Sequence, residues 1–494
     1  MEQAFDIVVI GGGPGGYVAA IRAARLGQRV ALVEKERPGG VCLNWGCIPT
    51  KAMVRSAEVL ETVRRAADYG IVTTGARLDY SAVLARRDGV VRDLTNGIAR
   101  LLEANGVTVF AGHARFTDPH TVAVHETAKP AAGDADTPRY AAPPVAGAPY
   151  ISLTGRNIVI ATGSRPLTPR LEGADLPGVI TSDGAFGLRA VPRRVVVVGG
   201  SAIGAEWAGL LHSFGAEVTI VEIMPTLVPA EDVEIARMLT RSFAKRGIRV
   251  LNSHTVTGIR QDSGGLLVGV EKTDKESDEV SADIVLFGIG RRPNTADLGL
   301  DRAGVQTDSR GYIPVDDTLR TNVGHIRAIG DVTGRRQLAH VASHQGLVAA
   351  SSICGHEEGV DYSVIPAATF THPEVASVGL TEAQAVRDGF EVSVARFPFA
   401  ALGRAHTYGE TEGMAKIVAD ATSGRVLGAH IIGPGASDLI AESTLALSHD
   451  ATLASIAETI HAHPTLSEVT WEASLSALGM PVHAAPRRSR NSRF

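Results

Sequence analysis

The sequence predicts an α/β protein with two dinucleotide-binding folds of the Rossmann type and a third, α+β domain towards its C-terminal end. Three observations lead to this prediction. A glycine-rich turn joins a strand pattern to a helix pattern near the N-terminus, the same pattern returns near residue 194, and the periodicity changes after about Tyr362. A length of 494 residues accommodates about three domains.

Composition narrows the classes of protein to consider. The chain has 44% hydrophobic and 20% charged residues and a formal net charge of −5, without the basic stripe of a nucleic-acid-binding protein. No apolar run approaches the roughly 18 residues of a membrane span, and the early strand pattern FDIVVI leaves no room for a signal segment. We therefore expect a cytoplasmic protein with no nucleic-acid or membrane partner, in which a cysteine pair is more often redox-active than structural.

Residues 5–34 read as a strand, a glycine turn, a helix and a second strand. Gly11, Gly13 and Gly16 fit the pattern G-x-G-x-x-G, which lets the backbone approach a pyrophosphate at a helix N-terminus. Glu34 ends the second strand about twenty residues on, where a carboxylate can bind ribose hydroxyls. Because these features occur in register, we predict a dinucleotide site here.

Residues 39–52, GGVCLNWGCIPTKA, hold two of the three cysteines of the chain. On a regular helix the five-residue spacing of Cys42 and Cys47 would separate their Cα atoms by about 8–9 Å, which exceeds the reach of a disulfide. If the two bridge, Cys42 must lie on irregular backbone and Cys47 at or just before a helix start, which Pro49 marks. A thiol at such a start is favoured as thiolate, the form that attacks disulfides.

Two other interpretations of this cysteine pair exist. The thiols could be small buried hydrophobic groups, or they could belong to a metal site. A zinc site needs two further ligands, and only Cys354 remains, so we predict no metal.

The following segments are predicted from apolar spacing and composition. Residues 55–68 and 80–104 have the spacing of helices, and residues 107–126 read as strands. Residues 127–149 are rich in Ala, Pro and Gly and predict a mobile loop. The basic tail, residues 481–494, is predicted to be disordered.

The second unit begins at Arg194 and repeats the opening theme. The spacing from Gly199 to Glu222 is 23 residues, the same as from the first glycine to the terminal acid of the first unit. Ser201 stands where the middle glycine would be, and Gly204 keeps the third position. We therefore predict a second dinucleotide site of matching size.

Glu222 also bears on the choice of cofactor. A carboxylate at the end of this strand favours a free ribose 2′-hydroxyl and repels a 2′-phosphate, and no arginine follows within the next ten residues. The sequence therefore favours NAD over NADP.

Later turns add further candidates. Thr162 and Gly163 lie at the end of the strand pattern NIVIATG, and Gly288 and Gly290 form a turn of close approach. Asp331 follows a strand pattern, where it is a candidate to bind a polyol; a helix cap is the alternative.

The motif HAHPTLSE places His463 and Glu468 on either side of Pro464. Pro464 rigidifies the turn, so that an imidazole and a carboxylate can form a hydrogen bond there, the arrangement of an oriented general base. A surface histidine and glutamate without a joint role is the alternative.

Seven motifs, GGVCLNWGCIPTK, ATGS, GSAIGAE, GIGRRPN, AIGDV, LAHVASHQG and HAHPTLSE, occur in one order between about Phe5 and Met480. Together they resemble the flavoprotein disulfide reductases, the class I pyridine nucleotide-disulfide oxidoreductases, and most closely those members that oxidise dihydrolipoamide. The resemblance implies FAD in the first nucleotide site, NAD in the second, and a homodimer in which His463 and Glu468 reach the cysteines of the other chain.

The resemblance also implies roles for individual residues. Cys47 would be the sulfur that faces the flavin and Cys42 the interchange sulfur, exposed to substrate, with Lys51 near the flavin and paired with Glu206. Flavin contacts would come from Gly40, Lys51, Gly112, Thr162, Gly163, Asp331 and Ala339, and NAD contacts from Ile203, Val256 and Gly290. Gln345 is a departure, because the family often has Glu there.

In this family the chain would divide into an FAD-binding and central domain (1–163 and 289–357), an NAD-binding domain (164–288) and a C-terminal dimerisation domain (358–480). The implied reaction is oxidation of dihydrolipoamide to lipoamide through a Cys42–Cys47 disulfide and FAD, with reduction of NAD⁺ to NADH. The implied partner is the lipoyl domain of a 2-oxo acid dehydrogenase or glycine cleavage complex.

Two alternatives stay open beside this reaction. One is an NAD(P)H-dependent reductase of a low-molecular-weight disulfide, which would share every argument about the cysteines. The other is a non-catalytic flavoprotein subunit of a larger assembly. A mercuric reductase would need a further thiol pair near the C-terminus, and the last cysteine of the chain is Cys354.

Overall fold

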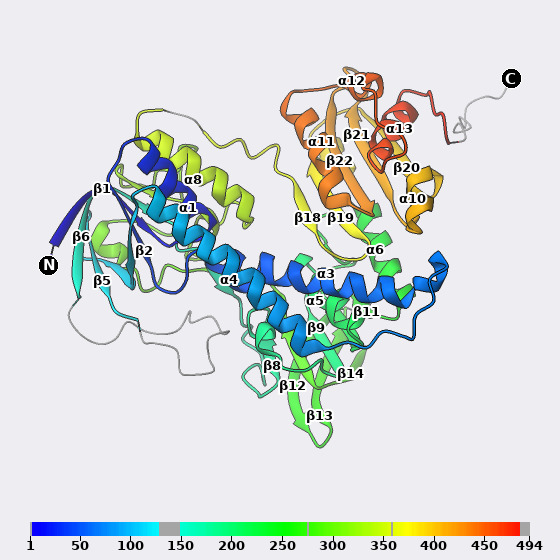
Figure 1. Cartoon of the computed structure of the whole chain (residues 1–494), viewed down its shortest axis with the longest axis horizontal. Helices are drawn as coiled ribbons and strands as arrows, with labels where there is room; N and C mark the ends of the chain where they lie inside the picture. The colour runs from blue at the N-terminus through cyan, green and yellow to red at the C-terminus, as the bar shows by residue number, and fades with distance from the viewer. Residues whose placement is uncertain (1, 128–148, 274–275, 357–358, 485–494) are drawn as a thin grey trace. The chain divides into compact units, whose positions relative to one another are not determined.

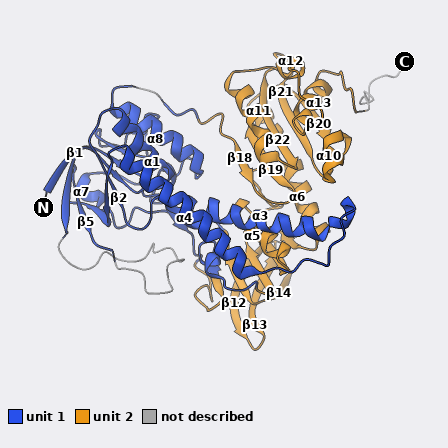
Figure 2. Cartoon of the chain, in the orientation of Figure 1, with its two compact units in different colours: residues 1–169, 180–191, 289–361 blue, residues 170–179, 192–288, 362–494 orange. Residues whose placement is uncertain are grey.

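The computed structural model describes residues 2–127, 149–273, 276–356 and 359–484 (Figure 1). The chain forms two compact units (Figure 2): the first comprises residues 1–169, 180–191 and 289–361, and the second residues 170–179, 192–288 and 362–494. Most of the predicted loop at 127–149 and of the predicted basic tail at 481–494 lies outside the described residues, so these two interpretations stay predictions.

A mixed sheet lies at the centre of the first unit, with strand order β3-β2-β1-β6-β5-β4 and β17 beside β6. Strand β1 pairs in parallel with β2 and β6, and β5 pairs antiparallel with β4 and β6. The strands are β1 (Glu2–Ile10), β2 (Val30–Glu34), β3 (Thr108–Ala111), β4 (His113–Phe116), β5 (Thr121–His125), β6 (Ile151–Ile160) and β17 (Ile326–Ala328). The parallel pairing places the ends of β1, β2 and β6 at one edge of the sheet.

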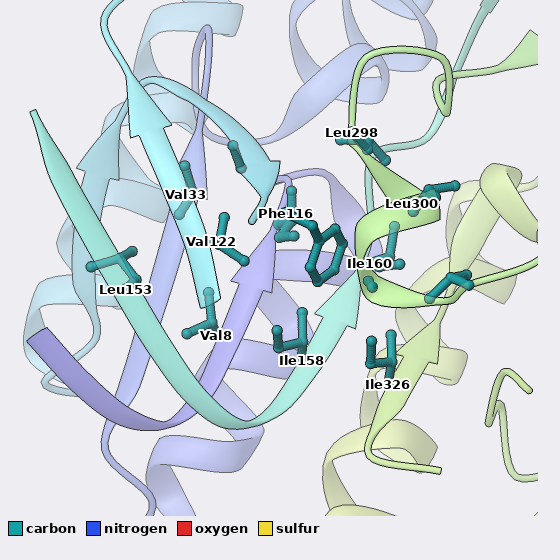
Figure 3. Packing of buried hydrophobic residues seen from close by; sticks show 14 of the residues in the cluster. Val8, Val33, Phe116, Val122, Leu153, Ile158, Ile160, Leu298, Leu300 and Ile326 are labelled. Carbon is teal, nitrogen blue, oxygen red and sulfur yellow. The ribbon is translucent and has the colours of Figure 1, made fainter. Parts of the chain in front are cut away.

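The apolar core of this unit explains why its strands are almost entirely hydrophobic. Val8, Phe116 and Ile158 are fully buried, and Figure 3 shows them in one cluster with side chains from β2, β5 and the segment around Leu298. Strands that are covered on both faces carry continuous rather than alternating apolar runs, as FDIVVI does. Each large apolar side chain buried here contributes about 1.5–3 kcal/mol.

Of the helices that the sequence predicts in the first unit, the one at 80–104 has the predicted bounds, and the one at 55–68 is shifted at both ends. They are α1 (Pro14–Arg25), α2 (Gly40–Trp45), α3 (Cys47–Arg64), α4 (Tyr80–Ala104), α7 (Leu300–Ala303) and α8 (Ala339–Ile353). Helix α4 has the predicted bounds, and the Asp79 side chain caps it by accepting from the Ala82 N–H. Helix α3 begins eight residues before the predicted start. Two short strands, β7 (Ser164–Pro166) and β16 (Arg291–Pro293), pair antiparallel.

The second unit contains the predicted repeat of the dinucleotide-binding fold. Strands β11, β10, β9 and β15 lie in this order in one sheet and are parallel. Strands β12, β13 and β14 form a separate antiparallel sheet. The elements are β8 (Val179–Thr181), β9 (Arg194–Val198), α5 (Ala202–Ser213), β10 (Glu217–Glu222), α6 (Val233–Arg246), β11 (Arg249–Asn252), β12 (His254–Asp262), β13 (Gly265–Lys272), β14 (Ser277–Ala282) and β15 (Ile284–Phe287).

The C-terminal part of the second unit is an antiparallel sheet with strand order β18-β19-β22-β21-β20, packed against α11 and α13. The predicted change to an α+β pattern after Tyr362 is confirmed. The elements are β18 (Ala367–Thr369), β19 (Glu374–Gly379), α9 (Glu382–Arg387), β20 (Val392–Pro398), α10 (Gly403–Tyr408), β21 (Met414–Asp420), β22 (Val426–Gly433), α11 (Ala436–Ser448), α12 (Leu453–Glu458) and α13 (Glu468–Ala477).

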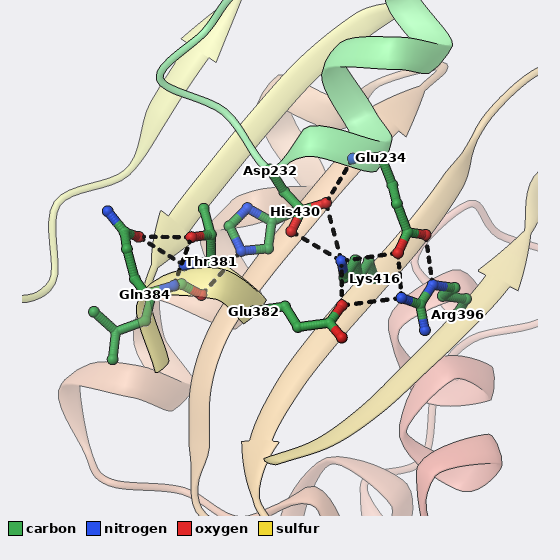
Figure 4. A network of polar contacts seen from close by, with 9 residues as sticks. Asp232, Glu234, Thr381, Glu382, Gln384, Arg396, Lys416 and His430 are labelled. Atoms are coloured by element: carbon green, nitrogen blue, oxygen red, sulfur yellow. Dashed lines mark hydrogen bonds and ion pairs between the residues drawn. The ribbon is translucent and has the colours of Figure 1, made fainter. Parts of the chain in front are cut away.

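A buried charge network joins α6 to this sheet (Figure 4). The Lys416 ammonium on β21 lies 2.9 Å from Asp232, 3.2 Å from Glu234 and 2.7 Å from Glu382, and its side chain is 1% exposed. Arg396 pairs with Glu234 and Glu382. A hydrogen bond from Arg396 and the nearby Lys416 lower the pKa of Glu234 to about 2.

Replacing the central cation should unfold this region more easily. We expect Lys416→Met to lower the free energy of unfolding by about 3–5 kcal/mol, because it removes the buried counter-charge of Asp232 and leaves Arg396 as the one cation of this network beside Glu234 and Glu382. Chemical denaturation measures the change. Arg425→Met is the control: it breaks the exposed ion pair with Asp450, which is worth at most about 1 kcal/mol. Equal effects of the two substitutions would contradict a special role for the network.

The network also predicts a pH dependence of stability. The folded-state pKa of Glu234, about 2, lies below the ordinary value of 4.5. Its stabilising contribution is therefore complete above pH 4.5 and is lost as the pH falls towards 2. We expect the stability difference between the wild type and Glu234→Gln to shrink over this range in acid titrations of unfolding. A difference that stays constant down to pH 2 would show that Glu234 is not stabilised as a carboxylate.

Candidate functional site

The first glycine turn has the predicted strand–turn–helix geometry. Strand β1 ends at Ile10, Gly11 has φ of +103°, and α1 begins at Pro14 after Gly13. A Cβ atom at Gly16 would lie 1.8 Å from the carbonyl oxygen of Gly11, so only glycine fits there. The turn thus brings bare backbone to the N-terminus of α1, where N–H groups can meet an anion.

Glu34 closes this turn from the end of β2. Its Oε2 accepts the Gly12 N–H at 2.6 Å and its Oε1 accepts the Glu36 N–H at 2.8 Å. Burial raises the pKa of Glu34, and the two backbone donors oppose that shift. A carboxylate has about four acceptor positions, so Glu34 can hold the loop and still accept a ribose hydroxyl.

The second glycine turn repeats these contacts in the second unit. Gly199 has φ of +98°, and a Cβ atom at Gly204 would lie 1.8 Å from the Gly199 carbonyl oxygen. Glu222 accepts the Gly200 N–H at 2.5 Å and the Met224 N–H at 2.7 Å. The repeat seen in the sequence is therefore also present in the structure, because the acid at the end of the second strand accepts the same backbone N–H groups in both units.

The structure explains why Ser201 can replace the middle glycine. Its φ and ψ are −67° and −179°, against −68° and −178° at Gly13, so this position has ordinary extended backbone in both turns. The Ser201 hydroxyl donates to the Gly288 carbonyl at 3.1 Å. The substitution therefore leaves the path of the turn unchanged.

The close approach at the second turn gives a sharp test within one helix. We expect Gly204→Ala to lower the free energy of unfolding by several kcal/mol, because its Cβ would overlap the Gly199 carbonyl oxygen and force the helix and turn apart. Gly209→Ala, also in α5, is the matched control: its nearest neighbour would be Phe243 at 3.7 Å. Thermal unfolding compares the two variants, and equal stabilities would contradict the steric argument.

The cysteines lie on two helices that meet at a break. Cys42 lies within α2, and Cys47 is the first residue of α3. The expectation that Cys42 lies on irregular backbone is wrong: the chain breaks at Gly46, with φ of −146° and ψ of −114°, between the two helices. The expectation that Cys47 lies at a helix start is confirmed, and Pro49 is in the first turn of that helix.

The two cysteine side chains form a hydrogen bond. This hydrogen bond and burial raise the pKa of the Cys42 thiol. The positive charge of Lys51 lowers this pKa and the negative charge of Asp331 raises it, which places both residues near the pair. Cys47 is exposed and Cys42 is half-buried. A dithiol in contact can form and break one disulfide, and so exchange two electrons.

Asp331 lies in a short 3₁₀ turn after β17 and is held by side chains that the sequence analysis did not single out. The Ser164 hydroxyl donates to its Oδ2, and Arg291 Nε donates to the Ser164 hydroxyl at 2.7 Å. Arg291 Nε is 3.8 Å from the Asp331 carboxylate. The turn is capped at Ile329, so Asp331 does not act as its N-cap. Ser164 and Arg291 stand within ATGS and GIGRRPN, and those motifs were the available signal.

Gln345, the departure from the family pattern, contacts the backbone of Gly330, the residue before Asp331. Its Oε1 accepts the Gly330 N–H at 2.6 Å, and the side chain is fully buried. An amide oxygen makes this contact as a carboxylate would, without burying a charge. The departure therefore preserves the local hydrogen bond.

Other candidates of the first unit gather near the ends of β1, β2 and β6. A Cβ atom at Gly40 would lie 2.7 Å from the Cα atom of Gly13, so these two backbones touch. The Gly112 N–H donates to the Glu34 carbonyl at 2.9 Å. Thr162 and Gly163 are fixed by Asn294, which exchanges three hydrogen bonds with them, and Ala339 begins α8.

The candidates of the second unit are more dispersed. Ile203 lies in the first turn of α5, next to the glycine turn, and Val256 lies on β12. Glu206, on α5, is buried and accepts the Phe370 N–H at 3.0 Å. Gly290 and Lys51 belong to the first unit, so the contact of Gly290 with NAD and the pairing of Lys51 with Glu206 stay predictions.

His463 and Glu468 form the predicted hydrogen bond. His463 Nδ1 lies 2.9 Å from Glu468 Oε1, and Glu468 Oε2 accepts the Thr465 N–H at 2.8 Å. Burial opposes ionisation, but these donors hold the pKa of Glu468 below its ordinary value. A carboxylate only accepts, so Nδ1 of His463 carries a proton and, in the neutral ring, Nε2 is the nitrogen with the free lone pair. The His463 side chain is 76% exposed, so Nε2 of the neutral ring is open to take a proton.

Two absences concern the described residues alone. They include no group of His, Cys, Asp and Glu arranged to hold a metal ion. None of the helices in the described part of the chain combines the length and the apolar character needed to span a membrane.

Known families match nearly the whole chain. Residues 5–346 match the pyridine nucleotide-disulphide oxidoreductase family, and residues 365–474 match the dimerisation domain of the same family. A dihydrolipoyl dehydrogenase of Chlamydia muridarum is 42% identical over 99% of this chain and 100% of its own length. One of Bacillus subtilis is 41% identical over 98% and 100%.

Solved structures give the same picture of the fold. LpdA of Mycobacterium tuberculosis is similar with a TM-score of 0.84 and 28% identity, over 95% of this chain and 98% of that protein. The HOCl-induced flavoprotein disulfide reductase RclA of Escherichia coli, solved as a Cu(II) complex, has a TM-score of 0.83 and 28% identity over 96% and 99%.

Proposed function

Because the chain belongs to the pyridine nucleotide-disulphide oxidoreductase family, we propose that it is an FAD-dependent enzyme that oxidises dihydrolipoamide to lipoamide and reduces NAD⁺ to NADH. The observation that carries this proposal is the Cys42–Cys47 pair, two thiols in contact at a helix junction. Relatives that match over their full length are dihydrolipoyl dehydrogenases, which supports dihydrolipoamide as the substrate.

The thiol chemistry follows from the geometry. The unprotonated Nε2 of His463 takes a proton from one thiol of dihydrolipoamide, and Glu468 stabilises the imidazolium that results. The substrate thiolate attacks Cys42 in the Cys42–Cys47 disulfide, a mixed disulfide forms, and Cys47 leaves as thiolate. The second substrate thiol then displaces Cys42, which leaves as a thiol, and releases lipoamide. Two electrons and two protons have left the substrate.

The pKa of Cys42 supports the assignment of the two sulfurs. The hydrogen bond with Cys47 and burial raise the pKa of the Cys42 thiol, which favours Cys47 as the member that carries the negative charge after exchange. The exposure of the single chain, in which Cys47 is exposed and Cys42 half-buried, differs from the expectation that Cys42 is the sulfur exposed to substrate. When bound, FAD supplies the transfer of the electron pair from the thiols to NAD⁺.

The first unit has a cradle that fits FAD. Gly13 and Gly40 bring two stretches of bare backbone together where the N–H groups of α1 begin, as a pyrophosphate needs. We assign the adenosine ribose to Glu34 and the ribityl chain to Asp331. The remaining flavin contacts are assigned to Gly11, Gly16, Lys51, Gly112, Thr162, Gly163 and Ala339.

The second turn fits NAD. Glu222 holds the Gly200 N–H and presents a carboxylate, which accepts a ribose 2′-hydroxyl and repels a 2′-phosphate. We assign Gly199, Ile203, Gly204, Val256 and Gly290 to the same cofactor, and Lys51 with Glu206 to a charge pair beside the flavin. This preference counts against a reductase that depends on NADPH.

We further propose a homodimer formed through the dimerisation domain, in which His463 and Glu468 serve the cysteines of the second copy. The high exposure of the His463 side chain in a single chain supports this arrangement. The domains would be 1–163 with 289–357, 164–288 and 358–480. The partner would be the lipoyl domain of a 2-oxo acid dehydrogenase or glycine cleavage complex, in the cytoplasm, where a cysteine pair is more often catalytic than structural.

A steady-state assay tests the reaction. With dihydrolipoamide, the holoenzyme should reduce NAD⁺ much faster than NADP⁺, and it should not oxidise NADPH with glutathione disulfide. The reverse preference would favour a reductase of low-molecular-weight disulfides. A chain that binds FAD but turns over neither pair would favour a non-catalytic flavoprotein subunit.

The base has its own test. We expect His463→Gln to lower dihydrolipoamide oxidation by about 10²–10⁴-fold, because no group then takes the thiol proton. NADH oxidation by ferricyanide needs no such base and should be unchanged. His406→Gln, which replaces an exposed histidine of the same domain whose Nε2 lies 2.8 Å from the Ala400 carbonyl oxygen, should leave both rates unchanged. Full dihydrolipoamide turnover in His463→Gln would remove His463 from the mechanism.

A further inference from the structure

The loop that carries His463 contains a second histidine, His461, whose hydrogen-bond contacts involve both ring nitrogens. His461 Nδ1 lies 2.9 Å from the Thr459 carbonyl oxygen, and its Nε2 lies 2.8 Å from Glu442 Oε1. A carbonyl and a carboxylate are both acceptors, so both ring nitrogens of His461 face acceptors of other residues. The hydrogen bond of His463 with Glu468, in contrast, uses Nδ1 alone.

Burial also separates the two histidines. The His461 side chain is 6% exposed and that of His463 is 76% exposed. Because its ring is covered and both ring nitrogens already face protein acceptors, His461 does not offer a nitrogen to a substrate. It is suited to hold the chain in place, and His463 is suited to react.

The contacts of His461 tie the loop to its surroundings from several sides. Glu442 lies on α11, and the Trp471 ring on α13 is centred 6.4 Å from the His461 ring. The Trp471 indole N–H donates to the Ala457 carbonyl on α12 at 2.9 Å. The His461 ring thus contacts residues of α11 and α13, and Trp471 in turn joins α13 to α12.

Only Ala462 separates His461 from the reactive histidine. On the other side of His463, the Thr465 hydroxyl donates to the Ala462 carbonyl at 2.7 Å, and the Thr465 N–H donates to Glu468. His463 therefore lies between His461, which is hydrogen-bonded to Glu442, and the turn that the Thr465 hydrogen bonds close. Its own ring makes one hydrogen bond, to Glu468, which fixes the tautomer but not the position of the loop.

We propose that His461 and Glu442 form a positioning pair for His463, which holds the loop so that Nε2 of His463 meets the substrate thiol. This inference rests on the proposed oxidation of dihydrolipoamide. A general base has to lie within about 2.6–3.2 Å of the proton that it removes, so a small shift of the loop reduces the rate strongly. The pair acts on the dithiol step alone, because the flavin and NAD⁺ steps do not use His463.

The test compares variants of the pair in the holoenzyme with two assays. We expect His461→Gln and Glu442→Ala to lower kcat for dihydrolipoamide oxidation by about 10–100-fold, through misplacement of the base, with KM changed little. NADH oxidation by ferricyanide should stay at the wild-type rate. His406→Gln is the matched histidine control and should change neither assay.

A conservative variant separates positioning from loss of folding. In Glu442→Gln, a neutral His461 can still donate to the Thr459 carbonyl and accept from the glutamine amide, so both hydrogen bonds are kept. We expect its kcat to stay within about fivefold of the wild type. If His461→Gln does not accumulate as folded holoenzyme, the comparison of Glu442→Ala with Glu442→Gln carries the same test.

The double variant decides whether His461 acts through His463. If it does, His461→Gln with His463→Gln should be no slower than His463→Gln alone. A further loss in the double variant, equal damage in Glu442→Gln and Glu442→Ala, or a parallel loss of ferricyanide reduction would overturn the proposal. Absence of dihydrolipoamide turnover in the wild type is a distinct result, which contradicts the proposed function itself and this role of His461 with it.

Discussion

The contact between a terminal strand carboxylate and a glycine-turn amide is the interaction on which both nucleotide-binding folds depend. Glu34 accepts the Gly12 N–H, and Glu222 accepts the Gly200 N–H. Each contact joins the end of the second strand to the turn after the first, so it fixes the N-terminus of the following helix. Because that helix end is where phosphates bind, one carboxylate sets the geometry of the whole site.

The redox pair depends on the same framework. Helix α2 begins at Gly40, whose backbone touches Gly13 of the first turn, and the pair of helices breaks at Gly46. The break lets Cys42 and Cys47 meet despite a spacing that would separate them on one helix. Their hydrogen bond and burial raise the pKa of Cys42, which makes two residues of the same type distinct. The surroundings of the pair thus distinguish the two sulfurs within the protein itself.

The limits of prediction from sequence follow from the range of the interactions. The bounds of α4 were predictable because its apolar spacing and its Asp79 cap are local signals. The position of Cys42 on a helix was not, because a helix of six residues carries little periodic signal. Ser164 and Arg291 were missed as partners of Asp331, since they come from distant segments of the chain. Glu442 was missed for the same reason, 19 residues before His461.

The sequence by itself determined the two glycine turns, their acids, the cysteine pair and the His463–Glu468 motif, because each is encoded by residues at short, regular spacings. The tertiary structure alone decided which groups the two neighbouring histidines contact and that the two thiols meet. Those contacts depend on which acceptors and charges other segments bring within about 3 Å, and on burial that removes competing water. Residue type sets the chemistry that is available, and packing decides which partners each residue meets.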